Sequence, residues 1–285
     1  MGKKLLQFFV YSNLFITGCA VLMVYQTSWL LLRQDPGYYL TGFVLFSTLC
    51  SYSFHWYLTA DTVIPSERVI WLKKYRYVHT ILFFIGLGGA GFFFYQLLPY
   101  WHWLLIAAFA TFLYSAPKIP HPWFRLLRKV AIGKTIFLAF VWMYVTSVLP
   151  VVVTGTAWNT GFVLFAVSRF FLIYAICILF DYRDRQDDKA AGVRSLITYL
   201  GEKSISLLFH FSIIIFLACT LLLQLYLTGS NLTVIILLLI PGIITWSLYD
   251  YARRHFSDML YYLVLDGLMA FSALLMLVFN YFCVS

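Results

Sequence analysis

The sequence predicts an all-α protein, a polytopic membrane bundle of about nine transmembrane helices with a cytoplasmic N-terminus. First, 62% of its 285 residues are hydrophobic and 11% are charged, whereas soluble domains carry about 25% charged residues. Second, apolar stretches recur at the length of about 20 residues that a bilayer core requires. Third, the basic residues gather in alternate loops, as membrane topology demands. The net charge of +9 therefore fits loops held against anionic lipid, and we expect no nucleic-acid partner.

Nine stretches reach or approach spanning length. The first follows Lys3 and Lys4, as in a signal peptide or lipoprotein leader, but it continues to Leu32 and no soluble domain follows it. We therefore interpret it as a spanning helix and expect a single domain over residues 1–285. The stretches lie at residues 8–32, 38–60, 78–98, 101–116, 132–153, 160–181, 205–227, 231–250 and 259–282.

The loops support this count. If the N-terminus is cytoplasmic, so are the loops after the second, fourth, sixth and eighth helices. The opposite loops hold one basic residue, Arg33. This asymmetry matches the positive-inside rule and predicts a multi-pass protein of the cell (inner) membrane. The basic residues of the cytoplasmic loops are Arg68, Lys73, Lys74, Arg76, Lys118, Arg125, Arg128, Lys129, Lys134, Arg183, Arg185, Lys189, Arg194, Lys203, Arg253 and Arg254.

A run of acids begins where the sixth helix leaves the membrane. Asp181, Asp184 and Asp188 are spaced i, i+3, i+7, so a continuing helix places them on one face. Their mutual repulsion requires a cation, and Mg²⁺ is the natural candidate because it takes oxygen ligands and shares them with phosphates. The alternative is a solvated helix end neutralised by Arg183, Arg185 and Lys189. We favour a metal–phosphate site because the run lies at a membrane exit beside basic loops.

This run resembles the second aspartate-rich motif of the UbiA superfamily of intramembrane prenyltransferases. The resemblance implies that Mg²⁺ ions held by two such motifs bind the diphosphate of an allylic prenyl donor. A hydrophobic acceptor, often an aromatic ring, then attacks the allylic cation. The resemblance assigns Asp181, Asp184 and Asp188 as catalytic metal and diphosphate ligands. The matching residues are Asp181-x-x-Asp184-x-x-x-Asp188-x-x-x-Gly192-Val193-Arg194-Ser195-Leu196, followed by Leu200-Gly201.

A second element of the resemblance follows the fourth helix, at residues 114–118. It is similar to the Tyr-Pro-x-x-Lys-Arg region that contacts diphosphate in that family, which implies a diphosphate contact for Lys118. Ile119 stands where arginine is usual. Arg125, Arg128 and Lys129 could supply the missing charge, or they could be ordinary positive-inside anchors.

The first aspartate-rich motif departs from the family pattern Asn-Asp-x-x-Asp-x-x-x-Asp. Ser53, Phe54 and Tyr57 occupy its first three fixed positions, and only Asp61 keeps a carboxylate as a remnant metal ligand. Phenylalanine cannot ligate Mg²⁺, so the first metal site is weakened or absent. The neighbouring His55 could contact a diphosphate or an acceptor, but we favour a packing histidine.

Two functions follow from this comparison. The leading hypothesis is a Mg²⁺-dependent membrane prenyltransferase, and the alternative is a non-catalytic isoprenoid- or lipid-binding relative. A transporter fits less well because the far loops carry almost no charge. Arg169 and Asp266 lie within apolar stretches, so we expect both to face the bundle interior, where they could pair with each other.

Overall fold

The computed structural model describes residues 2–59, 66–116, 133–190, 196–227 and 232–283, and within these ranges the chain is helical with no strand. Helices occupy all nine of the predicted apolar stretches, so the all-α class is confirmed. The helices are α1 (Gly2–Tyr11), α2 (Leu14–Thr27), α3 (Tyr38–Tyr57), α4 (Glu67–Lys74), α5 (Arg76–Gln96), α6 (Trp101–Ser115), α8 (Lys134–Met143), α9 (Leu149–Val153), α10 (Thr160–Ala190), α11 (Leu196–Tyr199), α12 (Glu202–Leu223), α13 (Leu232–Ser247), α14 (Tyr249–Ala252) and α15 (Asp266–Cys283).

Three of the long helices contain or adjoin a turn of wider π-helix. The π-helical turns are Ser28–Leu32 after α2, Tyr144–Val148 between α8 and α9, and Leu260–Leu265 before α15. Such turns are frequent at functional sites because they interrupt the regular hydrogen-bond ladder and free a carbonyl group. A short 3₁₀ turn, Leu98–Tyr100, leads into α6.

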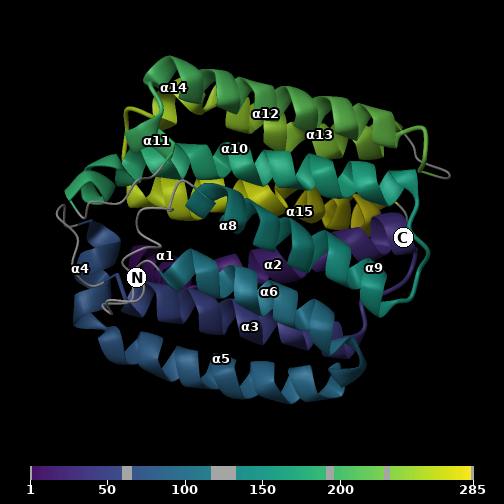
Figure 1. The fold of residues 1–285 in the computed structure, drawn as a ribbon, viewed down its shortest axis with the longest axis horizontal. Helices are drawn as coiled ribbons and strands as arrows, with labels where there is room; N and C mark the ends of the chain where they lie inside the picture. Colours follow the sequence, from purple (N-terminus) through teal and green to yellow (C-terminus); the bar gives the residue numbers. More distant parts are fainter. Residues whose placement is uncertain (1, 60–65, 117–132, 191–195, 228–231, 284–285) are drawn as a thin grey trace.

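The long helices run side by side along the longest axis of the molecule (Figure 1). α10 lies in the middle of the bundle and packs on α12 and α8, while α2 packs on α15. α5 lies at the edge and packs mainly on α3. Most of α10 is buried and most of α5 is exposed, as expected for a central helix and a helix that faces lipid.

Six of the nine helical regions are both long and apolar enough to cross a membrane. α13 is apolar but shorter, with 16 residues. A membrane helix bundle is therefore supported among the described residues, and the full count of nine spans stays a prediction. The six regions are Leu14–Leu32, Arg76–Gln96, Lys134–Val153, Thr160–Ala190, Glu202–Leu223 and Leu260–Phe282.

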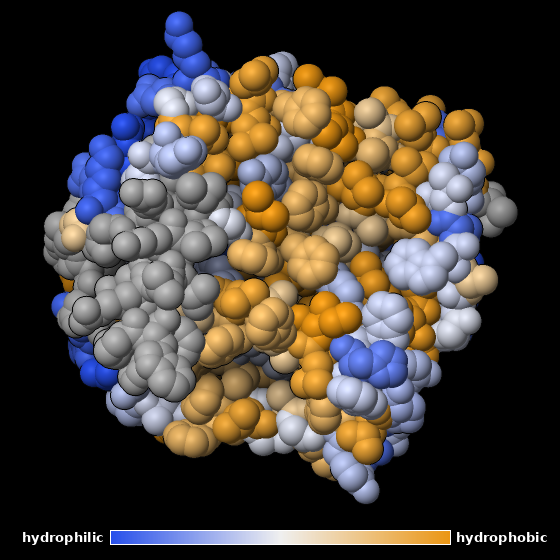
Figure 2. Space-filling view, viewed as in Figure 1, coloured by the Kyte–Doolittle hydropathy of each residue, from blue (hydrophilic) through white to orange (hydrophobic). Residues whose placement is uncertain are grey.

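The two ends of the bundle differ in charge. α4, α11, α14 and the last turns of α10 lie at one end, which we call the charged end (Figure 1). A space-filling view shows hydrophilic residues along this end and an apolar surface beside it (Figure 2). α1 lies at the charged end and α15 finishes at the opposite one, as an odd number of crossings requires. The cytoplasmic location of the charged end remains a prediction.

Glycine allows α3 and α5 to touch through their backbones. A Cβ atom built on Gly86 of α5 would lie 2.6 Å from the backbone nitrogen of Cys50 in α3 and 2.8 Å from its Cα. Real side chains do not approach backbone this closely, so any larger residue must push the two helices apart.

The Gly86→Ala variant is expected to lose about 1–3 kcal/mol of stability, the usual cost of overpacking a filled interface. Gly88 of the same helix has no atom within 4 Å of its built Cβ. Gly88→Ala is therefore the matched control, and it should match the wild type or gain up to about 1 kcal/mol from better helix propensity. Thermal unfolding in detergent compares the two. Equal midpoints for both variants would contradict the close contact at Gly86.

Arg169 faces the bundle interior, as predicted, and is 5% exposed. Its Nη1 atom donates to the carbonyl oxygens of Met23 (3.0 Å) and Thr146 (2.9 Å) and to the hydroxyl of Thr27 (2.9 Å). Its Nη2 atom donates to Oε1 of Gln26 at 2.6 Å. Thr146 lies in a π-helical turn, where a carbonyl is available to a partner outside the helix.

The possible pairing of Arg169 with Asp266 is wrong. The hydrogen bonds of Arg169 go to neutral acceptors on α2 and on the π-helical turn after α8. Asp266 is 9% exposed at the start of α15 and lies in the field of Arg68 and Arg183 instead. The interior position of both charges is confirmed, but they belong to different networks.

Candidate active site

The three predicted aspartates lie on the last turns of α10, which continues without a break to Ala190. The expectation that Asp181, Asp184 and Asp188 share one face of a helix is therefore supported, because residues three and four apart are neighbours on a helix surface. Asp181 and Asp188 are buried, and the side chain of Asp184 is 27% exposed. The row lies at the charged end of the bundle.

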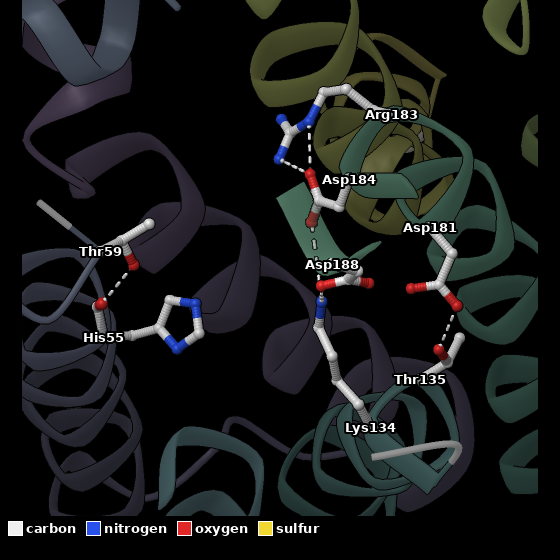
Figure 3. A network of polar contacts seen from close by, with 8 residues as sticks. All are labelled: His55, Thr59, Lys134, Thr135, Asp181, Arg183, Asp184 and Asp188. Atoms are coloured by element: carbon white, nitrogen blue, oxygen red, sulfur yellow. Dashed lines mark hydrogen bonds and ion pairs between the residues drawn. The ribbon is translucent and has the colours of Figure 1, made fainter. Parts of the chain in front are cut away.

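The first two residues of α8 contact this row (Figure 3). Nζ of Lys134 lies 3.7 Å from Oδ2 of Asp184 and 3.9 Å from Oδ1 of Asp188. The hydroxyl of Thr135 donates to Oδ2 of Asp181 at 2.6 Å. Because α8 begins at Lys134, its first turn delivers both side chains to the three carboxylates.

Arg183 holds Asp184 from the other side. Its Nε and Nη2 atoms donate to Oδ1 of Asp184 at 2.9 and 2.7 Å. Its guanidinium lies 4.5–5.2 Å from the ring centres of Phe180, Tyr261 and Tyr262. The two tyrosines are consecutive residues of a π-helical turn. These aromatic faces fix the guanidinium by cation–π attraction, so Asp184 has a rigid partner.

A second arginine is packed into the same aromatic group. Arg68 of α4 is 4% exposed, and its guanidinium lies 3.8 Å from the ring centre of Trp56 and 4.1 Å from that of Tyr262. Its Nη2 atom donates to Oδ1 of Asn13 at 2.5 Å, and its backbone N–H donates to Asp258 at 2.7 Å. Burial lowers the pKa of Arg68 from its ordinary value. Arg68 thus ties α4 to α2, α3 and the turn before α15.

The end of α3 carries a buried histidine opposite the carboxylates. His55 is 8% exposed, its ring stacks on Tyr114 of α6 at 4.8 Å, and its Nδ1 lies 3.4 Å from the hydroxyl of Ser115. Figure 3 shows its imidazole directed toward the side of the site that holds Lys134. Tyr114 lies within electrostatic range of Lys134. The packing interpretation of His55 is supported, and the packing places it beside the site.

The departures from the first aspartate-rich motif have structural uses. The ring of Phe54 packs 5.8 Å from that of Phe83 on α5. Tyr57 lies 4.3 Å from the guanidinium of Arg76, also on α5. Both residues therefore serve contacts between α3 and α5, and neither offers a carboxylate oxygen to a metal.

Several predicted site residues lie outside the described part of the chain. They are Asp61, Lys118, Arg125 and Arg128, together with Gly192, Val193, Arg194 and Ser195 of the second motif. The structure brings Asp181, Asp184 and Asp188 together with Lys134 and Thr135, and it pairs Asp184 with Arg183, which the sequence had offered as a neutralising charge. Sequence reasoning counted Lys134 only as a loop base. Its position at the start of an apolar helix directly after a basic loop was the available signal.

The carboxylates suit a divalent cation in their chemistry. Carboxylate oxygens are the hard donors that Mg²⁺ prefers, and the ammonium of Lys134 already lies between Asp184 and Asp188. That position therefore accepts a cation. Among the described residues no group of three His, Cys, Asp or Glu side chains converges into a ready metal site, so a metal requires a rearrangement of these side chains.

One of the three comparisons with known proteins gives a match, to a protein family. The model of the UbiA prenyltransferase family matches residues 58–263 of the chain. The matched region includes α4, the whole of α8 and α10, and the three aspartates. The comparisons with curated proteins and with solved structures gave no match.

Proposed function

We propose, because the chain belongs to the UbiA prenyltransferase family, that it transfers a prenyl group from an allylic prenyl diphosphate to a hydrophobic acceptor such as an aromatic ring. The family consists of membrane prenyltransferases that act on prenyl diphosphates and generally use a divalent metal held by aspartate-rich motifs. The family and the apolar helices make the chain an integral membrane protein. We propose the cell's inner membrane as its location and residues 1–285 as one domain.

The observation that carries this proposal is the row of carboxylates on α10 with cationic side chains among them. Asp181, Asp184 and Asp188 lie together at a bundle end, with Lys134 and Arg183 within 4 Å of Asp184. A merely solvated helix end does not need buried acids, yet Asp181 and Asp188 are 3% and 8% exposed. Burying carboxylates is costly unless cations compensate them.

In this proposal the three aspartates would hold Mg²⁺, which would supply charge neutralisation of the departing diphosphate. The bond between the allylic carbon and the diphosphate oxygen breaks, and the acceptor forms the new bond at that carbon and releases a proton. Aromatic faces around the site, including the stack of His55 on Tyr114, stabilise the positive charge and exclude water. Lys118, Arg125 and Arg128 are proposed diphosphate contacts, and Asp61 is a proposed remnant ligand.

The test uses purified full-length protein in nanodiscs. Radiolabelled allylic prenyl diphosphates of several chain lengths are supplied with Mg²⁺ and a lipid extract as the source of acceptor. We expect a labelled lipid product with equimolar release of diphosphate, and loss of both on chelation with EDTA. Absence of product with every donor, with no binding of any donor, would overturn the proposal.

One observation favours a second candidate, a non-catalytic isoprenoid-binding protein. Phe54 and Tyr57 stand where the family pattern places metal-binding aspartates, and both are used in packing. This candidate expects an isoprenoid that copurifies with the protein and exchanges with added donor, without release of diphosphate. Measuring donor binding and diphosphate release in the same samples separates the two functions.

A further inference from the structure

The ammonium of Lys134 lies at the carboxylate row of α10. Its side chain is 17% exposed, and its ammonium lies 3.7 Å from Asp184 and 3.9 Å from Asp188. Direct bonds between an ammonium and a carboxylate are about 2.7–2.9 Å long. The ammonium is therefore shared between the two carboxylates by charge attraction and is locked to neither.

Other titratable groups of the described residues lie around Lys134. Asp181 and Tyr114 are also within electrostatic range of its ammonium. Arg183 is bound to Oδ1 of Asp184, whereas Lys134 faces Oδ2. Among the described residues, two cations, Lys134 and Arg183, lie within 4 Å of the row.

A divalent metal and the ammonium of Lys134 compete for one place. Mg²⁺ binds carboxylate oxygens at about 2.0–2.1 Å, and two cations between the same pair of carboxylates repel each other strongly. A metal that enters between Asp184 and Asp188 must therefore displace the ammonium. Lysine has a flexible four-carbon stem, so its charge can move while its backbone stays at the start of α8.

We propose that Lys134 is an exchangeable cation: when no metal is bound, it neutralises Asp184 and Asp188, and it moves onto a diphosphate when a divalent metal takes its place. The second half of this statement rests on the proposed function, whereas the competition with metal does not. On the α3 side, Phe54 and Tyr57 offer no carboxylate. Lys134 then supplies, from the protein itself, positive charge that the first aspartate-rich motif gives through a metal.

The first measurement is the binding of Mn²⁺, a spectroscopic substitute for Mg²⁺, to full-length protein in detergent without substrate. Electron paramagnetic resonance of free Mn²⁺ gives the dissociation constant. Lys134→Met is expected to bind Mn²⁺ about tenfold or more tightly, because a competing positive charge is gone. Lys134→Arg keeps the charge and should stay near the wild type. Lys203→Met, at an exposed lysine of α12, is the matched control and should not change.

The second measurement is the binding of inorganic pyrophosphate in the presence of Mg²⁺, by isothermal titration calorimetry. Here Lys134→Met is expected to weaken binding about tenfold or more, because a positive charge no longer meets the phosphate oxygens. Lys203→Met again serves as the control. Opposite shifts in the two measurements support the exchange. If Lys134 only braced α8 against α10, its replacement would not raise the affinity for Mn²⁺ and lower the affinity for pyrophosphate.

The remaining outcomes overturn the proposal. They are unchanged Mn²⁺ affinity in Lys134→Met, tighter Mn²⁺ binding with unchanged pyrophosphate binding, and loss of both ligands. If Lys134→Met does not fold, Lys134→Gln gives the same comparison with a polar side chain. Opposite shifts in a protein that neither binds nor consumes prenyl diphosphates would support the exchange and overturn only the proposed function.

Discussion

The Asp184→Asn variant is expected to keep the fold and to lose prenyl transfer by about 10²–10³-fold, the usual loss when one preorganised electrostatic group is removed. The side chains of Lys134 and Arg183 meet at the two oxygens of Asp184. Asparagine has nearly the same shape but no charge, so a metal loses a ligand while the packing is unchanged. Initial rates of labelled product formation at saturating donor measure the effect.

Asp250→Asn is the matched control for this variant. Asp250 lies on α14 at the same end of the bundle, is largely exposed and pairs with Arg253 at 2.8 Å. Surface ion pairs of this kind contribute about 0–1 kcal/mol to stability, so activity should match the wild type. Activity of Asp184→Asn within about twofold of the control, far below the loss expected for a site group, would remove Asp184 from the site.

The Arg169→Met variant is expected to lose about 3 kcal/mol of stability. Methionine fills similar space, but the carbonyl of Thr146 and the amide oxygen of Gln26 lose a charged donor in a buried, apolar setting. The carbonyl of Thr146 keeps the hydroxyl of Thr27 as a donor at 2.6 Å, so the expected loss is that of the bonds to a charged donor, each worth about 1.5–3 kcal/mol. The midpoint of thermal unfolding in detergent should fall by several degrees.

Arg254→Met tests whether any loss of arginine has this effect. Arg254 follows α14 and is exposed, so its replacement should leave the unfolding midpoint unchanged. If Arg169→Met unfolds at the same temperature as this control, the acceptors around Arg169 find other donors and the arginine does not brace the bundle.

The bundle could be predicted from the sequence because its causes are local. The length of an apolar stretch decides whether a segment can become a spanning helix. The positive charge of the adjoining loops predicts on which side of the membrane those loops lie. The spacing of Asp181, Asp184 and Asp188 likewise fixes a shared helix face, provided that the helix continues, and α10 does continue.

The partners of these residues could not be predicted in the same way. Periodicity gives the face of a helix, but it does not say which distant side chain meets that face, as Lys134 does from 50 or more positions away. The sequence suggested a carboxylate for Arg169. Its acceptors instead include the backbone carbonyls of Met23 and Thr146, which carry no signature in the residue types. The aromatic enclosure of Arg68 between Trp56 and Tyr262 is hidden for the same reason.

The length of α10 has a kinetic consequence. Its 31 residues extend about 46 Å at 1.5 Å per residue, against a hydrocarbon core of about 30 Å. If α10 enters the core at its first residue, Thr160, the turns that bear the aspartates lie at the boundary between lipid and water. Under the proposed function, a substrate with an isoprenoid tail would reach them by lateral diffusion within the bilayer plane. Turnover should thus follow the mole fraction of substrate among the lipids, and dilution with inert lipid should slow the protein even when the amount of substrate per volume of solution is constant.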